Sequence, residues 1–182
     1  MKIKIIGKRI KYMFLGIFAI CLLLTGNVLQ AQSKDSLSAN TIPKGWDMTK
    51  YVFADTSGNT HTLKEFKGKY ILVDMWASWC IPCINEFPSL DSLKQEFKGK
   101  NIAFVQISCD RQRQRWYNQL YWSKRTGIQF FINGDMKFMQ DLKIATIPRY
   151  FLIDKNGKLL NGNMPKASDP ETKKILLQLK GI

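Results

Sequence analysis

The sequence is poor in the residues that bind metals and haem. Its 182 residues include a single histidine, His61, and four cysteines. A structural zinc site needs four ligands, so Cys80 and Cys83 would need both Cys109 and His61 as the other two. Covalent haem attachment needs a histidine directly after the second cysteine, and Ile84 stands there. We therefore expect neither a metal nor another cofactor.

Acidic residues are also scarce, with 14 Asp and Glu against 28 Lys and Arg and a formal net charge of +14. Such an excess can favour nucleic acids or anionic membranes when it gathers on one face. Here the basic residues are scattered. The densest run, RQRQR at 111–115, has an arginine at every second position, which spreads them around a helix. The run indicates a solvated helix, and we expect no nucleic-acid partner.

The first 31 residues have the three-part layout of a secretory signal peptide. Basic residues precede the apolar stretch MFLGIFAICLLLTG, and Ala31 offers the small residue of a cleavage site. An uncleaved membrane anchor is the alternative, because the apolar character extends over about the 18 residues that a span needs. Either way we expect an extracytoplasmic protein, periplasmic or tethered to the membrane. Residues 32–45, polar and turn-prone, would form a flexible linker to one domain at 46–182.

Beyond this leader, apolar runs of strand and helix type follow one another. Segments 70–76 and 102–108 are nearly continuous apolar runs, typical of strands buried on both faces. Between them, apolar residues at helical spacing from Pro82 to Phe97 predict one helix. Strand, helix and strand in this order predict a parallel pair with a right-handed crossover. We therefore expect an α/β fold with a mixed central sheet and helices on both faces.

Two hairpins are expected in addition. The first, at 51–63, would form an N-terminal hairpin. The second, at 149–161, contains Asn156-Gly157, which would supply the positive φ angles of a tight turn.

The remaining segments predict three helices and a strand. A helix at 110–125 would direct Trp116 and Leu120 inward, with Tyr117 and Tyr121 as further candidates for the core. The others are a strand at 128–132, a short helix at 136–142, and a C-terminal helix capped by Ser168 or Asp169 with Pro170 in its first turn.

The stretch WASWCIPCINEFP at 76–88 places two cysteines three positions apart at the expected start of a helix. There the free N–H groups and the helix dipole stabilise a thiolate at Cys80. Cys80, exposed, would attack a partner disulfide, and Cys83, more buried, would resolve the mixed disulfide. A permanent structural disulfide is the alternative, although a bridge that closes so short a loop restricts little chain entropy. Cys109 has no third partner and is expected to be an inert core residue.

This stretch resembles thioredoxin and, more closely, the TlpA/ResA-like extracytoplasmic thiol-disulfide oxidoreductases. ILVDMWASWCIPC, ending at Cys83, is similar to the thioredoxin strand and active site, and CIPCINEFP adds the Glu-x-Pro ending of the exported branch. ATIPRYFLID, around Pro148, resembles the loop in which a cis proline faces that site. The resemblance covers roughly residue 46 to the C-terminus. It implies a thioredoxin-like fold and catalysis by disulfide exchange.

The resemblance also implies a substrate-binding surface. Ile147-Pro148 would form the cis peptide beside the cysteines and offer its backbone to a substrate strand. An ordinary proline at the entry to a strand is the alternative. Trp79 would shield the sulfurs.

Two acids match catalytic positions of the resembling family. Asp74 matches the buried acid of thioredoxin, and because burial raises a carboxyl pKa, it could take the proton of Cys83 during resolution. A structural, loop-capping aspartate is the alternative. Gln106 departs from the pattern, since it stands where thioredoxin has a lysine near that acid. Glu86 resembles the glutamate that tunes thiol acidity, with a surface helix position as the alternative.

The expected function is the reduction of disulfides in exported proteins. Ile81-Pro82, between the cysteines, lacks the histidine that stabilises the thiolate of oxidants, which favours a reductant. The partners would be disulfide-containing exported proteins, such as apocytochromes, and a membrane thiol-disulfide electron donor. The protein itself would be a monomer. The alternatives are a peroxiredoxin-like peroxidase, whose usual Pro-x-x-x-Thr-x-x-Cys pattern is absent, and a non-catalytic peptide-binding module.

Overall fold

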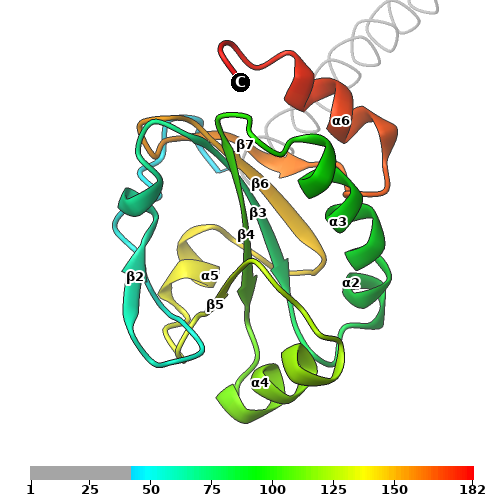
Figure 1. Cartoon of the computed structure of the whole chain (residues 1–182). Helices are drawn as coiled ribbons and strands as arrows, with labels where there is room; N and C mark the ends of the chain where they lie inside the picture. The colour runs from blue at the N-terminus through cyan, green and yellow to red at the C-terminus, as the bar shows by residue number, and fades with distance from the viewer. Residues whose placement is uncertain (1–41) are drawn as a thin grey trace, which may run out of the picture. The chain divides into compact units, whose positions relative to one another are not determined.

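The computed structural model of the chain describes residues 42–182 (Figure 1). The predicted signal peptide or anchor at 1–31 and most of the predicted linker lie outside the described residues. In the described part, every helix is too short or too polar to cross a bilayer.

Seven strands form one mixed sheet in the order β2-β1-β5-β4-β3-β6-β7. The strand bounds are β1 (Val52–Ala54), β2 (Thr60–Thr62), β3 (Tyr70–Trp76), β4 (Ile102–Ser108), β5 (Ile128–Phe131), β6 (Arg149–Ile153) and β7 (Leu159–Met164). β3, β4 and β5 run parallel to one another, and the outer pairs are antiparallel. The predicted mixed sheet, the N-terminal hairpin and the parallel β3–β4 pair are confirmed.

The helices divide between the two faces of this sheet. Their bounds are η1 (Leu63–Phe66), α2 (Ile81–Asn85), α3 (Phe87–Glu96), α4 (Arg113–Trp122), α5 (Lys137–Asp141) and α6 (Pro170–Leu177). Right-handed crossovers from β3 to β4 and from β4 to β5 put α2, α3 and α4 on the same face. Accordingly, Leu72 of the sheet packs with Leu90 of α3 and Leu176 of α6, and Trp76 packs with Trp116 of α4.

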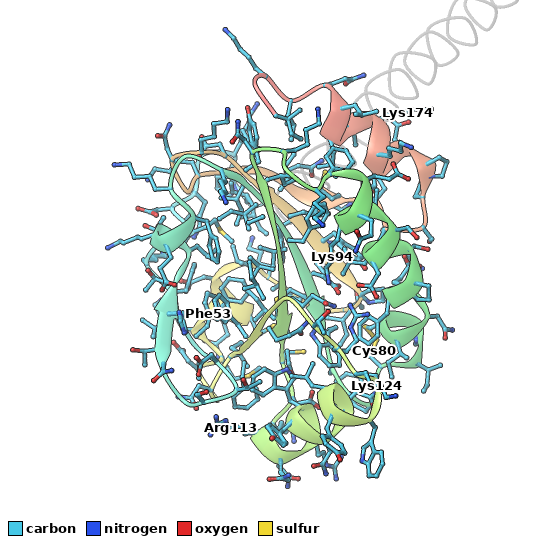
Figure 2. The ribbon with its side chains drawn as sticks, in the orientation of Figure 1. Phe53, Cys80, Lys94, Arg113, Lys124 and Lys174 are labelled. Atoms are coloured by element: carbon cyan, nitrogen blue, oxygen red, sulfur yellow. A yellow bond between two sulfur atoms is a disulfide. The ribbon has the colours of Figure 1, made fainter. Side chains whose placement is uncertain are left out.

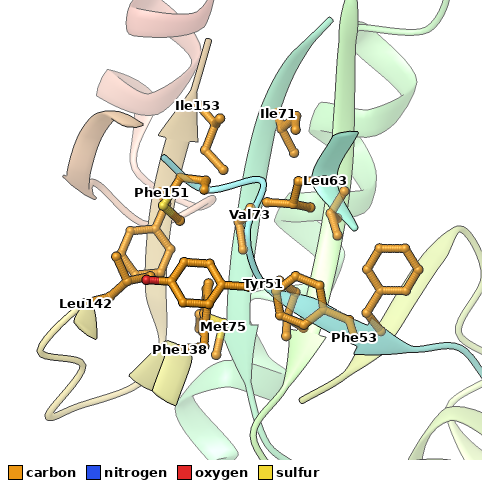
Figure 3. Close-up of a cluster of buried hydrophobic side chains, with 14 of the residues drawn as sticks. Tyr51, Phe53, Leu63, Ile71, Val73, Met75, Phe138, Leu142, Phe151 and Ile153 are labelled. Atoms are coloured by element: carbon orange, nitrogen blue, oxygen red, sulfur yellow. The ribbon is translucent and has the colours of Figure 1, made fainter. Parts of the chain in front are cut away.

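The opposite face is covered by α5, η1 and the chain before β1. Val73 and Met75 of β3 pack there with Phe138 of α5, Leu63 of η1 and Tyr51 (Figure 3). Because side chains alternate along a strand, Val73 and Met75 point to this face while the residue between them points to the other. Asp74 therefore lies on the face that α2 and α3 cover.

The single helix predicted from Pro82 to Phe97 is wrong, because the structure has two helices with a break at Glu86. The cause is Pro88, which has no N–H to donate to the carbonyl of Ile84 and so interrupts the helical hydrogen bonds. α2 ends at Asn85, and α3 begins at Phe87. The break gives the two-cysteine segment a short helix of its own.

The helix predicted at 110–125 is also shorter than expected, and two of its tyrosines point outward. Trp116 and Leu120 are buried as predicted, but Tyr117 and Tyr121 are exposed. Each tyrosine follows an inward residue directly, and one step along a helix turns the side chain by about 100°. The tyrosines therefore lie beyond the edge of the buried face.

The second hairpin is confirmed, but its turn differs from the prediction. Only Gly157 has a positive φ, of 78°, whereas Asn156 does not. Asp154 Oδ1 accepts hydrogen bonds from the backbone N–H groups of Asn156 and Lys158, both at 2.8 Å. The Asp154 side chain therefore stabilises a turn that is longer than the expected two-residue turn, because it accepts hydrogen bonds from two backbone N–H groups of that turn.

The neighbouring leucines at the end of α6 offer a direct test of the helix-covered core. Leu176 is fully buried, whereas Leu177 is 57% exposed. Leu176→Ala should lower the free energy of unfolding by about 2–5 kcal/mol, because it leaves a cavity. Leu177→Ala, the matched control, should change it by less than about 0.5 kcal/mol. Denaturant unfolding measures both, and equal losses would contradict this placement of α6.

Candidate active site

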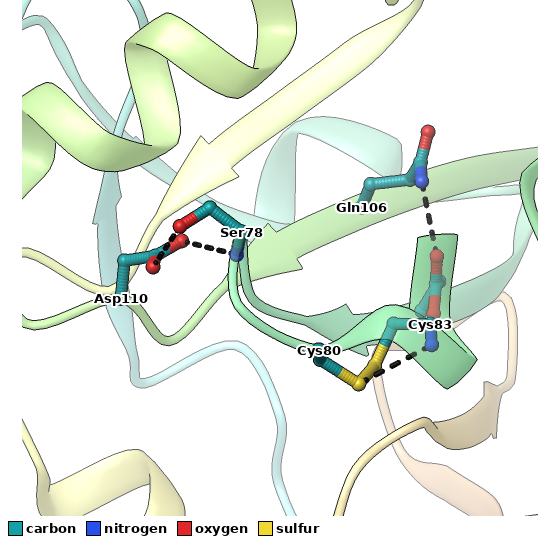
Figure 4. Close-up of a disulfide and its surroundings, with 6 residues drawn as sticks. Ser78, Cys80, Cys83, Gln106 and Asp110 are labelled. Carbon is teal, nitrogen blue, oxygen red and sulfur yellow. Dashed lines mark hydrogen bonds between the residues drawn. A yellow bond between two sulfur atoms is a disulfide. The ribbon is translucent and has the colours of Figure 1, made fainter. Parts of the chain in front are cut away.

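Cys80 and Cys83 form a disulfide at the start of α2, with their Cα atoms 5.3 Å apart (Figure 4). Cys80 is the N-cap residue, and its Sγ accepts a hydrogen bond of 3.2 Å from the backbone N–H of Cys83. Pro82 occupies the first turn, where a missing N–H costs no helical hydrogen bond. The sequence therefore fixes one cysteine at the helix start and the other one turn further along.

The expectation of an exposed Cys80 is wrong for this disulfide form. Cys80 is only 4% exposed and Cys83 is fully buried. Both pack in a cluster with Trp76, Phe87 and Trp116. Both cysteines lie within this cluster, so they differ little in exposure.

The residues on either side of Cys80 point outward instead. Trp79 is 60% exposed and Ile81 is 63% exposed. Trp79 lines a cavity together with Ile147. The predicted shielding of the sulfurs by Trp79 stays a prediction.

The Ile147–Pro148 peptide bond is cis, in the segment between α5 and β6. Ile147 packs against the cluster that holds the two cysteines. Pro148 lines a neighbouring groove together with Tyr150 and Ser168. The structure thus brings the predicted substrate-binding residues to the side of the disulfide.

A second strand supports the loop before Cys80 through Asp110, which the sequence reasoning missed. The buried Asp110 carboxylate accepts hydrogen bonds from the Ser78 backbone N–H (2.9 Å) and the Ser78 hydroxyl (2.7 Å) (Figure 4). It also accepts one from the Ser108 hydroxyl (2.7 Å). These contacts tie the active-site loop to the end of β4. The available signal was an acidic residue two positions after the end of a buried strand.

Asp74 lies in the middle of β3 and is 1% exposed. Its cross-strand partners are Gln106 in β4 and Tyr150 in β6. The side-chain amide of Gln106 donates a hydrogen bond of 3.0 Å to Asp74 Oδ2. Tyr150 is the second polar neighbour of Asp74, and its hydroxyl lowers the pKa of the carboxyl.

The other end of the Gln106 amide faces positive charge. Gln106 Oε1 accepts hydrogen bonds from Lys94 of α3 (3.0 Å; Lys94 is labelled in Figure 2), from Arg125 (2.7 Å) and from Gln129 (2.8 Å). Asp91, at the outer edge, pairs with both Lys94 and Arg125. Gln106 therefore stands between a buried carboxylate and two cations, with its donor end toward the carboxylate and its acceptor end toward the cations.

Burial raises the pKa of Asp74 from its ordinary 3.8 to about 7, against the opposing effects of the hydrogen bonds from Gln106 and Tyr150 and of the charges on Lys94 and Arg125. Burial also lowers the pKa of Lys94, and the charge of Arg125 adds to this effect. Gln106 stands where thioredoxin has a lysine near the buried acid. Here Lys94 and Arg125 supply the positive charge instead, and their hydrogen bonds reach the Gln106 amide and not Asp74 itself.

Glu86 makes a structural contact at the break between α2 and α3. Its two carboxylate oxygens accept hydrogen bonds from the backbone N–H and the hydroxyl of Ser168, each at 2.8 Å. Glu86 is 7% exposed, so the alternative of a surface position is wrong. The contact ties the active-site helices to the segment before α6, and a role in tuning thiol acidity stays a prediction.

Cys109 is half-buried and not a core residue as expected. It lines the cavity beside Trp79 and Ile147. Burial, followed by the negative charge of Asp110, raises the pKa of its thiol to about 11, which keeps it protonated and unreactive at neutral pH. Within the described residues, histidine, cysteine and carboxylate side chains form no group of three that could hold a metal ion.

Comparison with known proteins gives one family and several similar structures. A family model described as Redoxin matches residues 37–177. The solution structure of a candidate thiol-disulfide oxidoreductase from Bacteroides vulgatus is 40% identical, with a TM-score of 0.66, over 72% of this chain and 88% of that one. A crystal structure from the same organism, of the thioredoxin domain of a thiol-disulfide oxidoreductase, is 25% identical, with a TM-score of 0.68, over 76% of this chain and 98% of that one.

A curated relative is similar over a smaller share of its length. The thiol-disulfide oxidoreductase ResA of Bacillus subtilis (strain 168) is 27% identical over 122 residues, which cover 66% of this chain and 66% of ResA. The match therefore spans slightly less than two thirds of that relative.

The raised pKa of Asp74 predicts a loss of stability as the pH rises. Between the ordinary pKa of 3.8 and about 7, the folded chain keeps a proton that the unfolded chain has released. Stability from this group is therefore fully present below about pH 4 and is lost as the pH rises through about 7, by up to about 4 kcal/mol. Denaturant unfolding of the disulfide form at about pH 4 and pH 8 should show this extra loss in the wild type and not in Asp74→Asn. Parallel pH profiles of the two proteins would contradict the assignment.

Proposed function

The chain belongs to the Redoxin family and has the thioredoxin-like fold, and on that premise we propose that it is a thiol-disulfide oxidoreductase that reduces disulfides in exported proteins. The observation that carries the proposal is the Cys80–Cys83 disulfide, which lies at the start of α2 beside the Ile147–Pro148 cis peptide. Relatives described as thiol-disulfide oxidoreductases support the class of reaction.

The reaction is a pair of thiol-disulfide exchanges. The Cys80 thiolate attacks one sulfur of the substrate disulfide, and the other substrate sulfur leaves as a thiolate. The Cys83 thiolate then attacks Cys80 Sγ, and the second substrate sulfur leaves as a thiolate. Two electrons pass to the substrate, and the protein is left with the Cys80–Cys83 disulfide seen in the structure. A dithiol donor restores the reduced form by the same exchange in reverse.

Asp74 is the base that prepares the second step. A carboxyl with a pKa of about 7 is partly ionised at neutral pH and can take a proton from a thiol. Gln106 holds Oδ2 of this carboxyl through a hydrogen bond of 3.0 Å, and Oδ1 is the oxygen that we assign to the proton of Cys83.

Reduction is favoured over oxidation by what surrounds Cys80. Hydrogen-bond donors near the thiolate stabilise the reduced form, and a protein whose reduced form is stabilised acts as an oxidant. Here Ile81 and Pro82 carry no donor, and the hydrogen bond to Cys80 Sγ within the described residues comes from the Cys83 backbone. A reductant in an oxidising compartment needs a membrane dithiol donor, and its substrates would be exported disulfide proteins such as apocytochromes.

The proposed roles of the two cysteines predict opposite results for two serine variants. Wild type with dithiothreitol should reduce insulin, and both variants should fail. When the pre-reduced variants are mixed with insulin in the absence of dithiothreitol, Cys83→Ser should accumulate a mixed disulfide between Cys80 and insulin, because attack remains and resolution is lost. Cys80→Ser should accumulate none, and Cys109→Ser, the control, should behave as wild type.

Non-reducing electrophoresis and mass spectrometry identify the adduct and its cysteine. An adduct in Cys80→Ser alone would reverse the two roles. A wild type that does not accelerate insulin reduction would overturn the reductase and favour the non-catalytic peptide-binding module.

The base role of Asp74 predicts an effect on one step only. Asp74→Asn should slow resolution by about 100-fold, the lower end of what a positioned base contributes, while first attack by Cys80 stays nearly unchanged. The wild-type resolution rate should rise as the pH passes about 7, the pKa of Asp74, and this rise should be absent in the variant. Rapid-quench kinetics with a disulfide peptide separate the two steps. Asp91→Asn, at the exposed end of the network, is the control, and equal slowing of both steps by Asp74→Asn would remove the base role.

A further inference from the structure

A cavity of about 880 Å³ lies next to the apolar cluster that holds the disulfide. On one side it is lined by Trp79, Cys109 and Ile147, and the last two also pack against the cluster that holds Cys80 and Cys83. Neither of these two cysteines lines the cavity, but Trp79 directly precedes Cys80 in the chain. The far side of the cavity is lined by residues of the basic run before and within α4.

The RQRQR run is exposed throughout, as expected, but its three arginines have different neighbours. Arg113, labelled in Figure 2 at the start of α4, donates hydrogen bonds to the carbonyls of Asp55 and Thr56 in the N-terminal hairpin, at 3.2 and 2.7 Å. Arg111 and Arg115 instead line the cavity. The three arginines of this run therefore have two different roles: Arg113 binds the hairpin, and Arg111 and Arg115 line the cavity.

The two cavity arginines are not neutralised by their surroundings. Within residues 42–182, the Arg111 guanidinium has no hydrogen-bond or ion-pair partner, and Arg115 donates to the uncharged Gln112 at 3.2 Å. The acidic residue in the lining is Asp110, whose carboxylate is 1% exposed and is held by Ser78 and Ser108. The cavity therefore presents positive charge beside apolar surface.

We propose that Arg111 and Arg115 select substrate polypeptides that carry an acidic side chain close to the cysteine that Cys80 attacks. This inference rests on the proposed function and names the substrate class of the same site. The apolar lining of Trp79, Met136 and Met139 suits the side chains of an extended segment, while the arginines offer donors that match a carboxylate. Two unpaired guanidinium groups suffice for one carboxylate, whereas a nucleic acid needs a longer basic track.

The size of the cavity sets the position of the acidic residue. A space of this volume is about 10 Å across, and an extended chain covers that distance in about three residues. Because side chains alternate between the two faces of an extended chain, the acidic side chain is expected two or four residues from the cysteine of the substrate, on the same face.

The test uses the reduced full-length chain and three synthetic peptides with the same cysteine, blocked as a disulfide with a chromogenic thiol. The peptides differ only at the second and fourth residues from that cysteine, which are both Glu, both Gln or both Lys. At low salt the wild type should reduce the Glu peptide about three- to tenfold faster than the Gln peptide in kcat/KM, as two exposed ion pairs allow. High salt should flatten the difference because it screens exposed charges.

Variants of the basic run separate a specific contact from general charge. Arg111→Gln with Arg115→Gln should abolish the preference for Glu, and Arg111→Glu with Arg115→Glu should reverse it toward the Lys peptide. Arg113→Gln removes the same charge from the same run but should keep the preference, because Arg113 binds the hairpin. Circular dichroism and the rate with the Gln peptide check that each variant is folded and active.

The outcomes distinguish this inference from the function on which it rests. Equal rates for the Glu, Gln and Lys peptides would overturn the selection by charge and leave the reductase intact. A preference that survives in the double Gln variant, or that Arg113→Gln removes equally, would also overturn it. Reduction of none of the peptides by the wild type would overturn the reductase itself and the inference with it.

Discussion

The hydrogen bond between Gln106 and Asp74 is the contact on which the arrangement of the active site depends. Asp74 points into the face of the sheet that α2 and α3 cover, where an isolated charge is costly. The register of β3 and β4 places Gln106 beside Asp74, and the Gln106 amide connects the carboxyl to the positive charges of Lys94 and Arg125. α3, the segment after α4 and the central strands β3 and β4 must all hold their places for this compensation to work. The same polar network therefore stabilises the packing of α2 and α3 on the sheet and sets the pKa of Asp74.

Features that depend on local sequence were predictable, and those that depend on distant side chains were not. β3 and β4 match their predicted bounds because a continuous apolar run leaves little choice of register or limits. The cysteine pair at a helix start and the cis peptide at Pro148 followed from motifs. The contacts of Gln106 with two cations, and of Asp110 with Ser78, join elements far apart in the chain. No periodicity reports which side chains will meet across such distances.

Some errors came from signals that were present but were weighed wrongly. Pro88 marks the break after α2, yet the apolar spacing on either side suggested one continuous helix. The burial of Cys80 could not be read from the motif, because it depends on packing with residues far along the chain, such as Trp116 and Phe131. The RQRQR run looked uniform as sequence, but the fold gives Arg113 a structural partner and leaves Arg111 and Arg115 at a cavity. The spacing of residues along the sequence predicts which side chains share a helix face, but it does not predict which other elements pack against that face.

The use of an amide in place of a direct lysine contact has a consequence for the chemistry. A cation touching Asp74 would stabilise the carboxylate strongly and hold its pKa low, which would leave a weak base. Burial without compensation would keep the group protonated and equally unable to take a proton. Gln106 holds the two cations one side chain away, so that burial and attraction balance with the pKa of Asp74 at about 7. The pKa of Asp74 thus lies in the range in which a carboxyl can exchange a proton at neutral pH, because the two cations are near Asp74 but do not contact it.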